Sequence, residues 1–106
     1  TKAALDHFSR IVSLEVADKG VRVNTINPGP IRTDIVLNAG GTQEQSDQTF
    51  ELMGKLTPLQ RVGTVEETAR AIAFLASDEH ASYITGVNLT VDGGQQNMWI
   101  NLSSLS

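Results

Sequence analysis

The pattern of apolar positions predicts a helix over residues 1–18. Apolar side chains recur there with the period of about 3.6 residues that is typical of an α-helix. They share one broad stripe made of Ala4, Leu5, Phe8, Ile11, Val12 and Val16. Leu14 lies on the other side together with two alanines, so we expect this helix to bury more than one face. Gly20 follows and is expected to end the helix.

Two short strands are predicted, and a turn follows each of them. Residues 21–26 are rich in β-branched side chains and stop at Asn27-Pro28-Gly29-Pro30. Residues 87–91 alternate apolar and polar side chains and stop at Asp92-Gly93-Gly94. These two segments are therefore predicted to be strands, each leading directly into a glycine-containing turn.

A second helix is predicted to begin after Thr64. Glu67 stands three residues later, which is the spacing of a capping box, and apolar residues at helical spacing follow. The stretch 34–57 before this helix is polar and contains glycines, with only a weak helical pattern near its end. A connection of that length is usually a functional lid or a flexible segment.

The order of elements predicts an α/β protein with parallel strands. Two strands joined through a helix imply a right-handed crossover and parallel pairing. Two strands and two helices cover each other poorly, because the sheet edges and the second apolar side of the first helix stay without partners. We therefore expect neighbouring strands that are not part of this sequence.

Composition and charge exclude several functional classes. The net charge of −4 and the scattered eight Lys and Arg residues argue against a surface for nucleic acid or for an anionic membrane. No apolar run approaches the ~20 residues that span a bilayer. Without cysteine there is no disulfide framework or thiolate catalyst, and the histidines have no ligand spacing, so no metal site is predicted. We expect a reducing compartment, the cytoplasm, with organelle targeting left open.

The end of the first strand is the clearest candidate for a binding site. Ligands of parallel α/β sheets bind outside the carboxyl ends of the strands. Gly29 allows the backbone to approach a ligand closely, and the hydroxyl of Thr33 follows. The alternative is a plain turn with proline at its corners. Arg32 is interpreted as a solvated charge rather than a phosphate contact, and Asp92-Gly93-Gly94 as a structural strand exit.

Several segments, taken in order, resemble the C-terminal portion of the short-chain dehydrogenase/reductase family, and within it the 3-oxoacyl-carrier-protein reductase branch. They are Thr1-Lys2-Ala3-Ala4-Leu5 and residues 21–33, 58–63, 71–77, 84–86 and 91–94. The resemblance implies that residues 1–106 form the C-terminal part of a single Rossmann-like domain with a doubly wound parallel sheet. It also implies that residues 34–57 form a substrate lid and residues 95–106 a tail.

The resemblance implies which residues form the site. Lys2 matches the lysine of the family's Tyr-x-x-x-Lys pair, whose tyrosine would stand three residues before the first residue of this chain. In the family this tyrosine is the general acid/base, and the lysine lowers its pKa and binds the nicotinamide ribose. Pro28-Gly29 matches the cofactor-contacting turn. The backbone of Ile31 is expected to meet the nicotinamide carboxamide, and the Thr33 hydroxyl the carboxamide or the pyrophosphate.

The resemblance also implies an activity and partners. The expected activity is interconversion of a small-molecule carbonyl and alcohol with NAD or NADP, in a homodimer or homotetramer. The first helix would form one subunit interface, and the last strand with its tail another. Because the catalytic Ser, the Tyr and the glycine-rich cofactor loop of the family do not occur in this sequence, the chain alone is predicted to be inactive. The alternative is a non-catalytic oligomerisation or interaction module derived from the same family.

Overall fold

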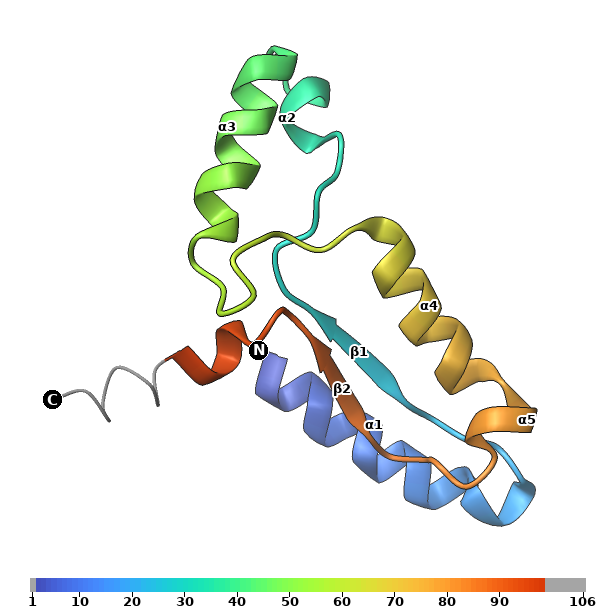
Figure 1. Cartoon of the computed structure of the whole chain (residues 1–106). Helices are drawn as coiled ribbons and strands as arrows, with labels where there is room; N and C mark the ends of the chain where they lie inside the picture. The colour runs from blue at the N-terminus through green and yellow to red at the C-terminus, as the bar shows by residue number, and fades with distance from the viewer. Residues whose placement is uncertain (1, 99–106) are drawn as a thin grey trace, which may run out of the picture. The chain divides into compact units, whose positions relative to one another are not determined.

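The computed structural model describes residues 2–98, which fall into two compact units. The first unit comprises Thr1–Asn27 and Ala69–Thr90, and the second comprises Pro28–Thr68 and Val91–Ser106. The chain crosses between the units after Asn27, after Thr68 and after Thr90. Figure 1 colours the chain by residue number, so these crossings can be followed along it.

The first predicted helix and its stop are confirmed. Helix α1 spans Lys2–Val16 and continues into a 3-10 turn, η1, over Ala17–Lys19. Gly20 then adopts a φ of 73° in the left-handed region, and its N–H donates to the carbonyl of Ala17. This conformation is accessible to glycine at no steric cost, and it ends the helix.

The two strands pair in parallel, as predicted. Strand β1 covers Thr25–Pro28 and strand β2 covers Asn88–Val91. The N–H of Thr25 donates to Val87 O over 3.0 Å, and four residues later the N–H of Gly29 donates to Val91 O over 2.9 Å. Because the partner advances by four residues in the same direction, the strands run parallel.

Strand β1 begins later than the predicted residue 21. Side chains replace part of the backbone ladder before Thr25, since the N–H of Val23 donates to Thr85 Oγ1 and the Asn24 amide bonds Ile84 O and Val87 N. The alternation of side chains nevertheless extends to residue 22, because Arg22, Asn24 and Ile26 all line one cavity of about 500 Å³ against α4. The prediction was therefore right about the extended conformation and wrong about where regular pairing begins.

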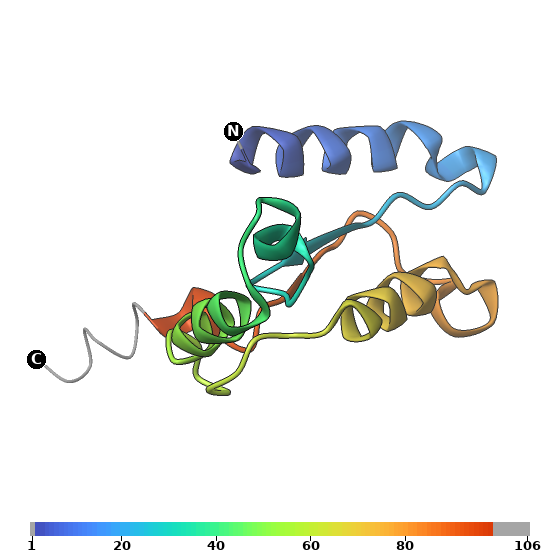
Figure 2. The same cartoon turned by 90° about the horizontal axis from the view of Figure 1, so that it is seen from above.

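Within the first unit, helices α1 and α4 (Val65–Ala76) lie on opposite sides of the strand pair (Figure 2). On the α1 side, Ser9 Oγ donates to Asn88 Oδ1 over 3.5 Å, and Ser13 lies so close to Gly86 that a Cβ there would meet its Oγ at 2.9 Å. On the α4 side, Arg22 donates to Leu75 O over 2.7 Å. This arrangement is a parallel sheet covered on both faces.

Within the described residues helix α1 is mostly exposed, and burial of its second face stays a prediction that requires further strands or a partner subunit. Ser13 is its one buried residue, whereas the side chains of Leu5, Phe8 and Leu14 are 62%, 63% and 79% exposed. The physical reason is the narrow sheet, because two strands cannot cover a helix that is apolar on two sides. This agrees with the expected lack of partners for the second apolar side.

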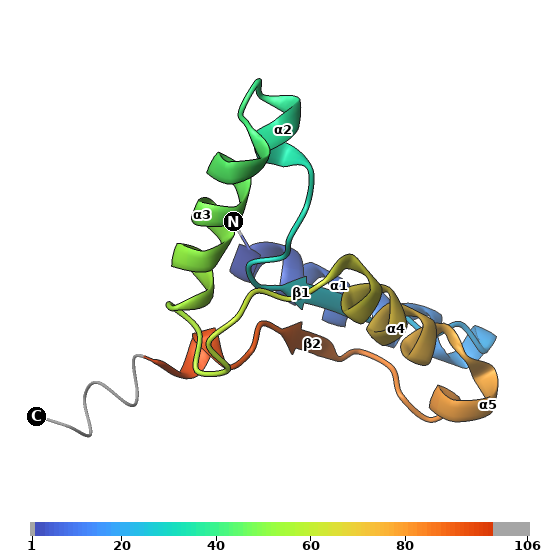
Figure 3. The ribbon, with the colours of Figure 1, turned by 45° about the horizontal axis from the view of Figure 1, so that its top comes forward.

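In the second unit, the predicted long loop over residues 34–57 contains two helices. Helix α2 covers Ile35–Asn38 and helix α3 covers Gln43–Gly54, and the two lie side by side (Figure 3). A capping box begins α3: Thr42 Oγ1 accepts from the Gln45 N–H over 3.1 Å, and Gln45 Oε1 accepts from the Thr42 N–H over 2.9 Å. The pattern Thr-x-x-Gln was visible in the sequence and would have predicted this helix.

Helix α4 begins where the sequence predicts it. Thr64 Oγ1 accepts from the Glu67 N–H over 3.1 Å, and Glu67 Oε1 accepts from the Thr64 N–H over 3.0 Å. The short helix α5 (Asp78–Ala81) and the 3-10 turn η2 (Gln95–Asn97) were not predicted. Of the predicted tail over residues 95–106, the part from 99 onward lies outside the described residues. No helix within residues 2–98 is both long and apolar enough to cross a membrane.

Candidate cofactor-binding site

The Pro28-Gly29 turn packs tightly against the turn that follows β2. A Cβ placed on Gly29 would lie 2.5 Å from Asp92 Cβ and 2.7 Å from Asp92 Cα. Real Cβ atoms do not approach other carbons so closely. Glycine is therefore required at position 29 by the neighbouring Asp92 backbone, a reason that differs from the predicted approach of a ligand.

Ile31 lies in an isolated parallel bridge with Gly63. The Gly63 N–H donates to Pro30 O over 3.0 Å, and the Arg32 N–H donates to Gly63 O over 2.9 Å. In an extended chain, the N–H and C=O of the residue between these two groups point to the opposite side. Within residues 2–98 the Ile31 N–H and C=O have no hydrogen-bond partner. The Ile31 N–H is therefore an available donor and the Ile31 C=O an available acceptor on the same side of the chain. Such a pair is complementary to the oxygen and the NH₂ group of a primary carboxamide.

A cavity of about 110 Å³ lies beside this bridge. It has room for a few waters at about 30 Å³ each, and it is smaller than the ~300–1,000 Å³ of typical ligand pockets. Its walls mix apolar and charged groups, namely Pro30, Ile31, Leu59, Arg61, Gly63, Glu67, Thr68, Val91, Asp92 and Gly93. The described residues of the second unit thus form one wall of a candidate ligand site, with Ile31 as part of it.

The other predicted site residues are both exposed. Thr33 Oγ1 accepts from the Ile35 N–H over 3.3 Å at the start of α2, and its own proton is available to an acceptor. Lys2 lies in the first turn of α1. The structure brings Pro28, Gly29, Ile31 and Thr33 together in the second unit, whereas Lys2 belongs to the first.

Arg32 is exposed, as the interpretation of a solvated charge requires, but it is also paired. Its guanidinium forms an ion pair with Asp47 of α3 and lies 5.5 Å from the centre of the Phe50 ring. The Arg32 hydrogen bond, followed by one from Gln43, lowers the pKa of Asp47 below its ordinary value. No local pattern in the sequence could reveal this pair, because the two residues are 15 positions apart.

A second ion pair joins the segment between α3 and α4 to the first turn of α4. Arg61 binds Glu67 with both terminal nitrogens, each over 2.8 Å. The Arg61 hydrogen bond, with that of the Thr64 backbone, lowers the pKa of Glu67 to about 2. The carboxylate therefore stays charged in its capping role. The Thr64–Glu67 capping pair is a local pattern in the sequence, whereas the contact of Glu67 with Arg61 is not.

The contacts of Asp92 support the interpretation of Asp92-Gly93-Gly94 as a structural exit from β2. Asp92 accepts from the Gly94 N–H and the Gln96 N–H, each over 2.9 Å, and so organises the chain that leaves the strand. Among the residues that the structure describes, no group of three His, Cys, Asp or Glu side chains could hold a metal ion.

Parallel strands with a helix on each face define an open α/β protein. The unpaired peptide groups beyond the carboxyl end of β1 stand where such folds bind ligands. Comparisons with known proteins agree. A family model described as enoyl-(acyl carrier protein) reductase matches residues 1–96. The chain belongs to this family of short-chain dehydrogenases/reductases.

Individual relatives make the comparison specific. The 3-oxoacyl-[acyl-carrier-protein] reductase FabG of Chlamydia muridarum is 48% identical over 93 residues, covering 88% of this chain and 35% of the relative. A short-chain dehydrogenase/reductase of unknown function from Caenorhabditis elegans, crystallised with cofactor, superposes with a TM-score of 0.78 at 32% identity, covering 90% of this chain and 36% of that one. YwfH, an NADPH-dependent reductase of bacilysin biosynthesis, superposes with a TM-score of 0.71 at 41% identity, covering 88% and 37%. The chain spans about a third of the length of the relatives that it matches.

Proposed function

We propose that this chain forms the nicotinamide end of the cofactor site in an NAD(P)-dependent oxidoreductase that interconverts a carbonyl and an alcohol. The observation that carries this proposal is the Ile31 N–H and C=O pair, which has no partner within residues 2–98. Its donor and acceptor match the oxygen and the NH₂ group of a carboxamide. The relatives support the proposal, since YwfH is NADPH-dependent and FabG is a reductase.

The proposal assigns a task to each predicted site residue. NAD or NADP, when bound, supplies or accepts the hydride. The Ile31 peptide groups orient its carboxamide, and the Thr33 hydroxyl donates to the carboxamide or the pyrophosphate. Pro28-Gly29 holds the backbone in place against Asp92. Lys2 binds the ribose hydroxyls and lowers the pKa of a tyrosine supplied from outside this chain, so that the phenol exchanges a proton near neutral pH.

Cofactor analogues test the role of Ile31. In 3-acetylpyridine adenine dinucleotide, a methyl group replaces the carboxamide NH₂, so the Ile31 C=O loses its donor while the N–H keeps its acceptor. A net hydrogen bond of about 0.5–1.5 kcal/mol predicts about two- to tenfold weaker binding than for NAD in a fluorescence titration. Equal affinities of the two dinucleotides would contradict the assignment.

A substitution tests Lys2 separately. Lys2→Ala in the complete protein should lower turnover sharply while far-ultraviolet circular dichroism stays the same, because Lys2 is exposed in a helix that other contacts hold. Unchanged turnover would remove Lys2 from the mechanism. The chain by itself is predicted to show no turnover, which an assay of the 11.4 kDa species would check.

The remaining assignments are parts of the same proposal. Residues 34–57 form a lid over a small-molecule carbonyl or alcohol, and the similarity to FabG favours a 3-oxoacyl substrate. Enzyme assays with acyl and sugar substrates would separate these classes. A cytoplasmic location and a homodimer or homotetramer stay predictions, which fractionation and sedimentation would test.

One observation favours the alternative of a non-catalytic interaction module. Leu5, Phe8 and Leu14 expose much of their apolar surface on α1, which suits self-association. Such a module should show no change in nicotinamide fluorescence at any protein concentration, and its association should weaken when Phe8 is replaced by a polar residue. Saturable nicotinamide binding would exclude this alternative.

A further inference from the structure

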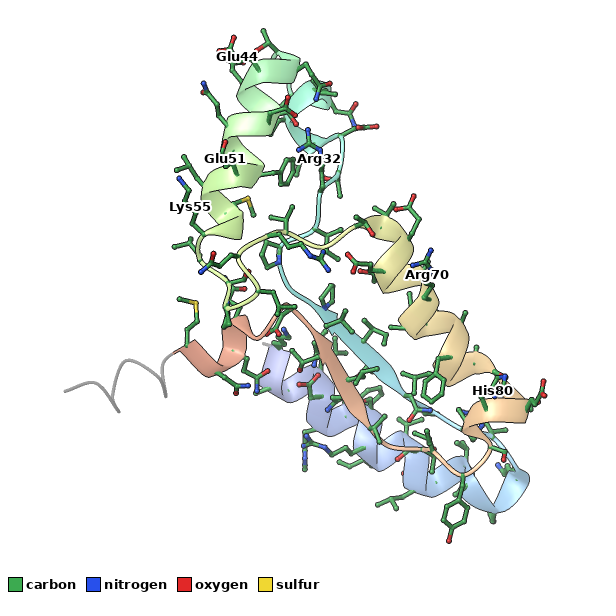
Figure 4. All side chains as sticks on the ribbon, viewed as in Figure 1. Arg32, Glu44, Glu51, Lys55, Arg70 and His80 are labelled. Atoms are coloured by element: carbon green, nitrogen blue, oxygen red, sulfur yellow. The ribbon has the colours of Figure 1, made fainter. Side chains whose placement is uncertain are left out.

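Arg32 stands between Ile31 and Thr33, two of the residues that the proposed function assigns to the cofactor. Its backbone N–H is held by Gly63 O over 2.9 Å, so the segment around Ile31 and Thr33 has a defined path. Its side chain leaves this segment and reaches helix α3 (Figure 4). One residue therefore connects the candidate cofactor segment to a helix of the proposed lid.

Two residues on one face of α3, Asp47 and Phe50, receive this side chain, and Gln43 of the same face bonds Asp47. Gln43, Asp47 and Phe50 are spaced by four and three residues, so they share a face. Asp47 forms the ion pair with Arg32 and also accepts from Gln43 Nε2 over 3.0 Å. The Arg32 guanidinium lies 5.5 Å from the centre of the Phe50 ring, and Phe50 is only 4% exposed. The guanidinium thus binds a carboxylate and stacks on a buried ring at once, which an ammonium group does poorly.

We propose that Arg32 is a positioning residue that couples helix α3 to the cofactor-binding segment, so that cofactor binding and the placement of α3 favour each other. This inference rests on the proposed function. The linkage is reciprocal: a cofactor that orders residues 31–33 favours the position of α3 to which Arg32 binds, and that position in turn favours the cofactor.

Helix α3 should keep its structure when Arg32 is replaced. Its first turn is closed by the capping box of Thr42 and Gln45, which does not involve Arg32. Loss of Arg32 should therefore leave α3 helical but less fixed in its position. The cofactor affinities of the variants can then be compared between proteins that are equally folded.

The test combines cofactor affinity with hydrogen exchange in the complete protein. The variants are Arg32→Ala, Asp47→Asn and the double variant, with Arg70→Ala and Glu51→Gln as matched controls on exposed positions of α4 and α3. Each single variant should raise the KM for NADPH about two- to fivefold, as expected for loss of an exposed ion pair, with kcat nearly unchanged. The double variant should be no worse than either single one, and Arg32→Lys should restore only part of the affinity. The controls should leave KM unchanged.

Hydrogen exchange of the peptide covering residues 43–54 gives the second readout. In the unsubstituted protein, NADPH should slow exchange of this peptide, and Arg32→Ala should abolish that slowing. If the increases in KM caused by Arg32→Ala and Asp47→Asn multiply in the double variant, the coupling is overturned, because Arg32 would then contact the cofactor independently of Asp47. Binding of NADPH without protection of residues 43–54 would also overturn it while the proposed function stands. Absence of any NADPH or NADH binding would defeat the proposed function and the coupling together.

Discussion

Replacing Gly29 with alanine should destabilise the protein through a backbone collision. The added Cβ would stand 2.5 Å from Asp92 Cβ, whereas ordinary contacts begin at 3.4 Å, so the two turns must separate by 0.9 Å to restore an ordinary contact. The opposing atoms include Asp92 Cα, which cannot rotate away as the end of a long side chain can. Separation also strains the 2.9 Å hydrogen bond from the Gly29 N–H to Val91 O. Overpacking of this kind costs about 2–3 kcal/mol.

Urea denaturation of Gly29→Ala and Gly63→Ala would measure this cost against a matched control. A Cβ on Gly63 would meet its nearest atoms only at 3.9 Å, and neither glycine has a φ in the left-handed region. Gly63→Ala should therefore leave the free energy of unfolding within about 0.5 kcal/mol, or raise it slightly by restricting the unfolded chain. Equal free energies of unfolding for the two variants would refute the collision argument. A loss of NADPH affinity in Gly29→Ala without a loss of stability would instead favour the ligand-approach interpretation of this glycine.

Three further substitutions test contacts that hold the helices. Thr64→Ala removes the acceptor for the Glu67 N–H and should lower the free energy of unfolding by about 1 kcal/mol in urea, an effect that Thr64→Ser should largely avoid. Because the pKa of Glu67 falls from an ordinary 4.5 to about 2 on folding, its contribution is complete above about pH 4.5 and disappears as the pH falls toward 2. Glu67→Gln should accordingly flatten this part of the pH dependence of the unfolding free energy, and an unaltered slope would contradict the assignment. Arg22→Ala leaves the Leu75 and Ile84 carbonyls without this donor and should cost about 1.5–3 kcal/mol by chemical denaturation, with Arg22→Lys recovering only part.

Local patterns in the sequence predicted the elements whose signals lie within a few residues. The Thr64–Glu67 pair marked the start of α4, and the left-handed Gly20 marked the end of α1. The missed helix α3 carried the same kind of signal in Thr42 and Gln45, so its omission reflects the glycines and polar residues around it. The boundary of β1 was misplaced because side chains replace part of the backbone pairing before Thr25, which a propensity pattern does not register.

The candidate site was predicted in part. The sequence located the segment from Pro28 to Thr33, because a β-branched run that stops at Pro-Gly-Pro is a local pattern. It could not show that the Ile31 peptide groups lack a partner, since that depends on Gly63 bonding both neighbouring peptides. It also could not show that Arg32 binds α3.

The sequence by itself determined helices α1 and α4, the two strands, their parallel pairing and the family to which the chain belongs. These properties follow from residue patterns and from interactions between positions three or four apart. Only the tertiary structure decided why Gly29 must be glycine, which peptide groups of Ile31 stay available and which helix Arg32 binds. Each of these depends on residues that are distant in the chain, and their approach is set by the packing of whole elements rather than by any local preference.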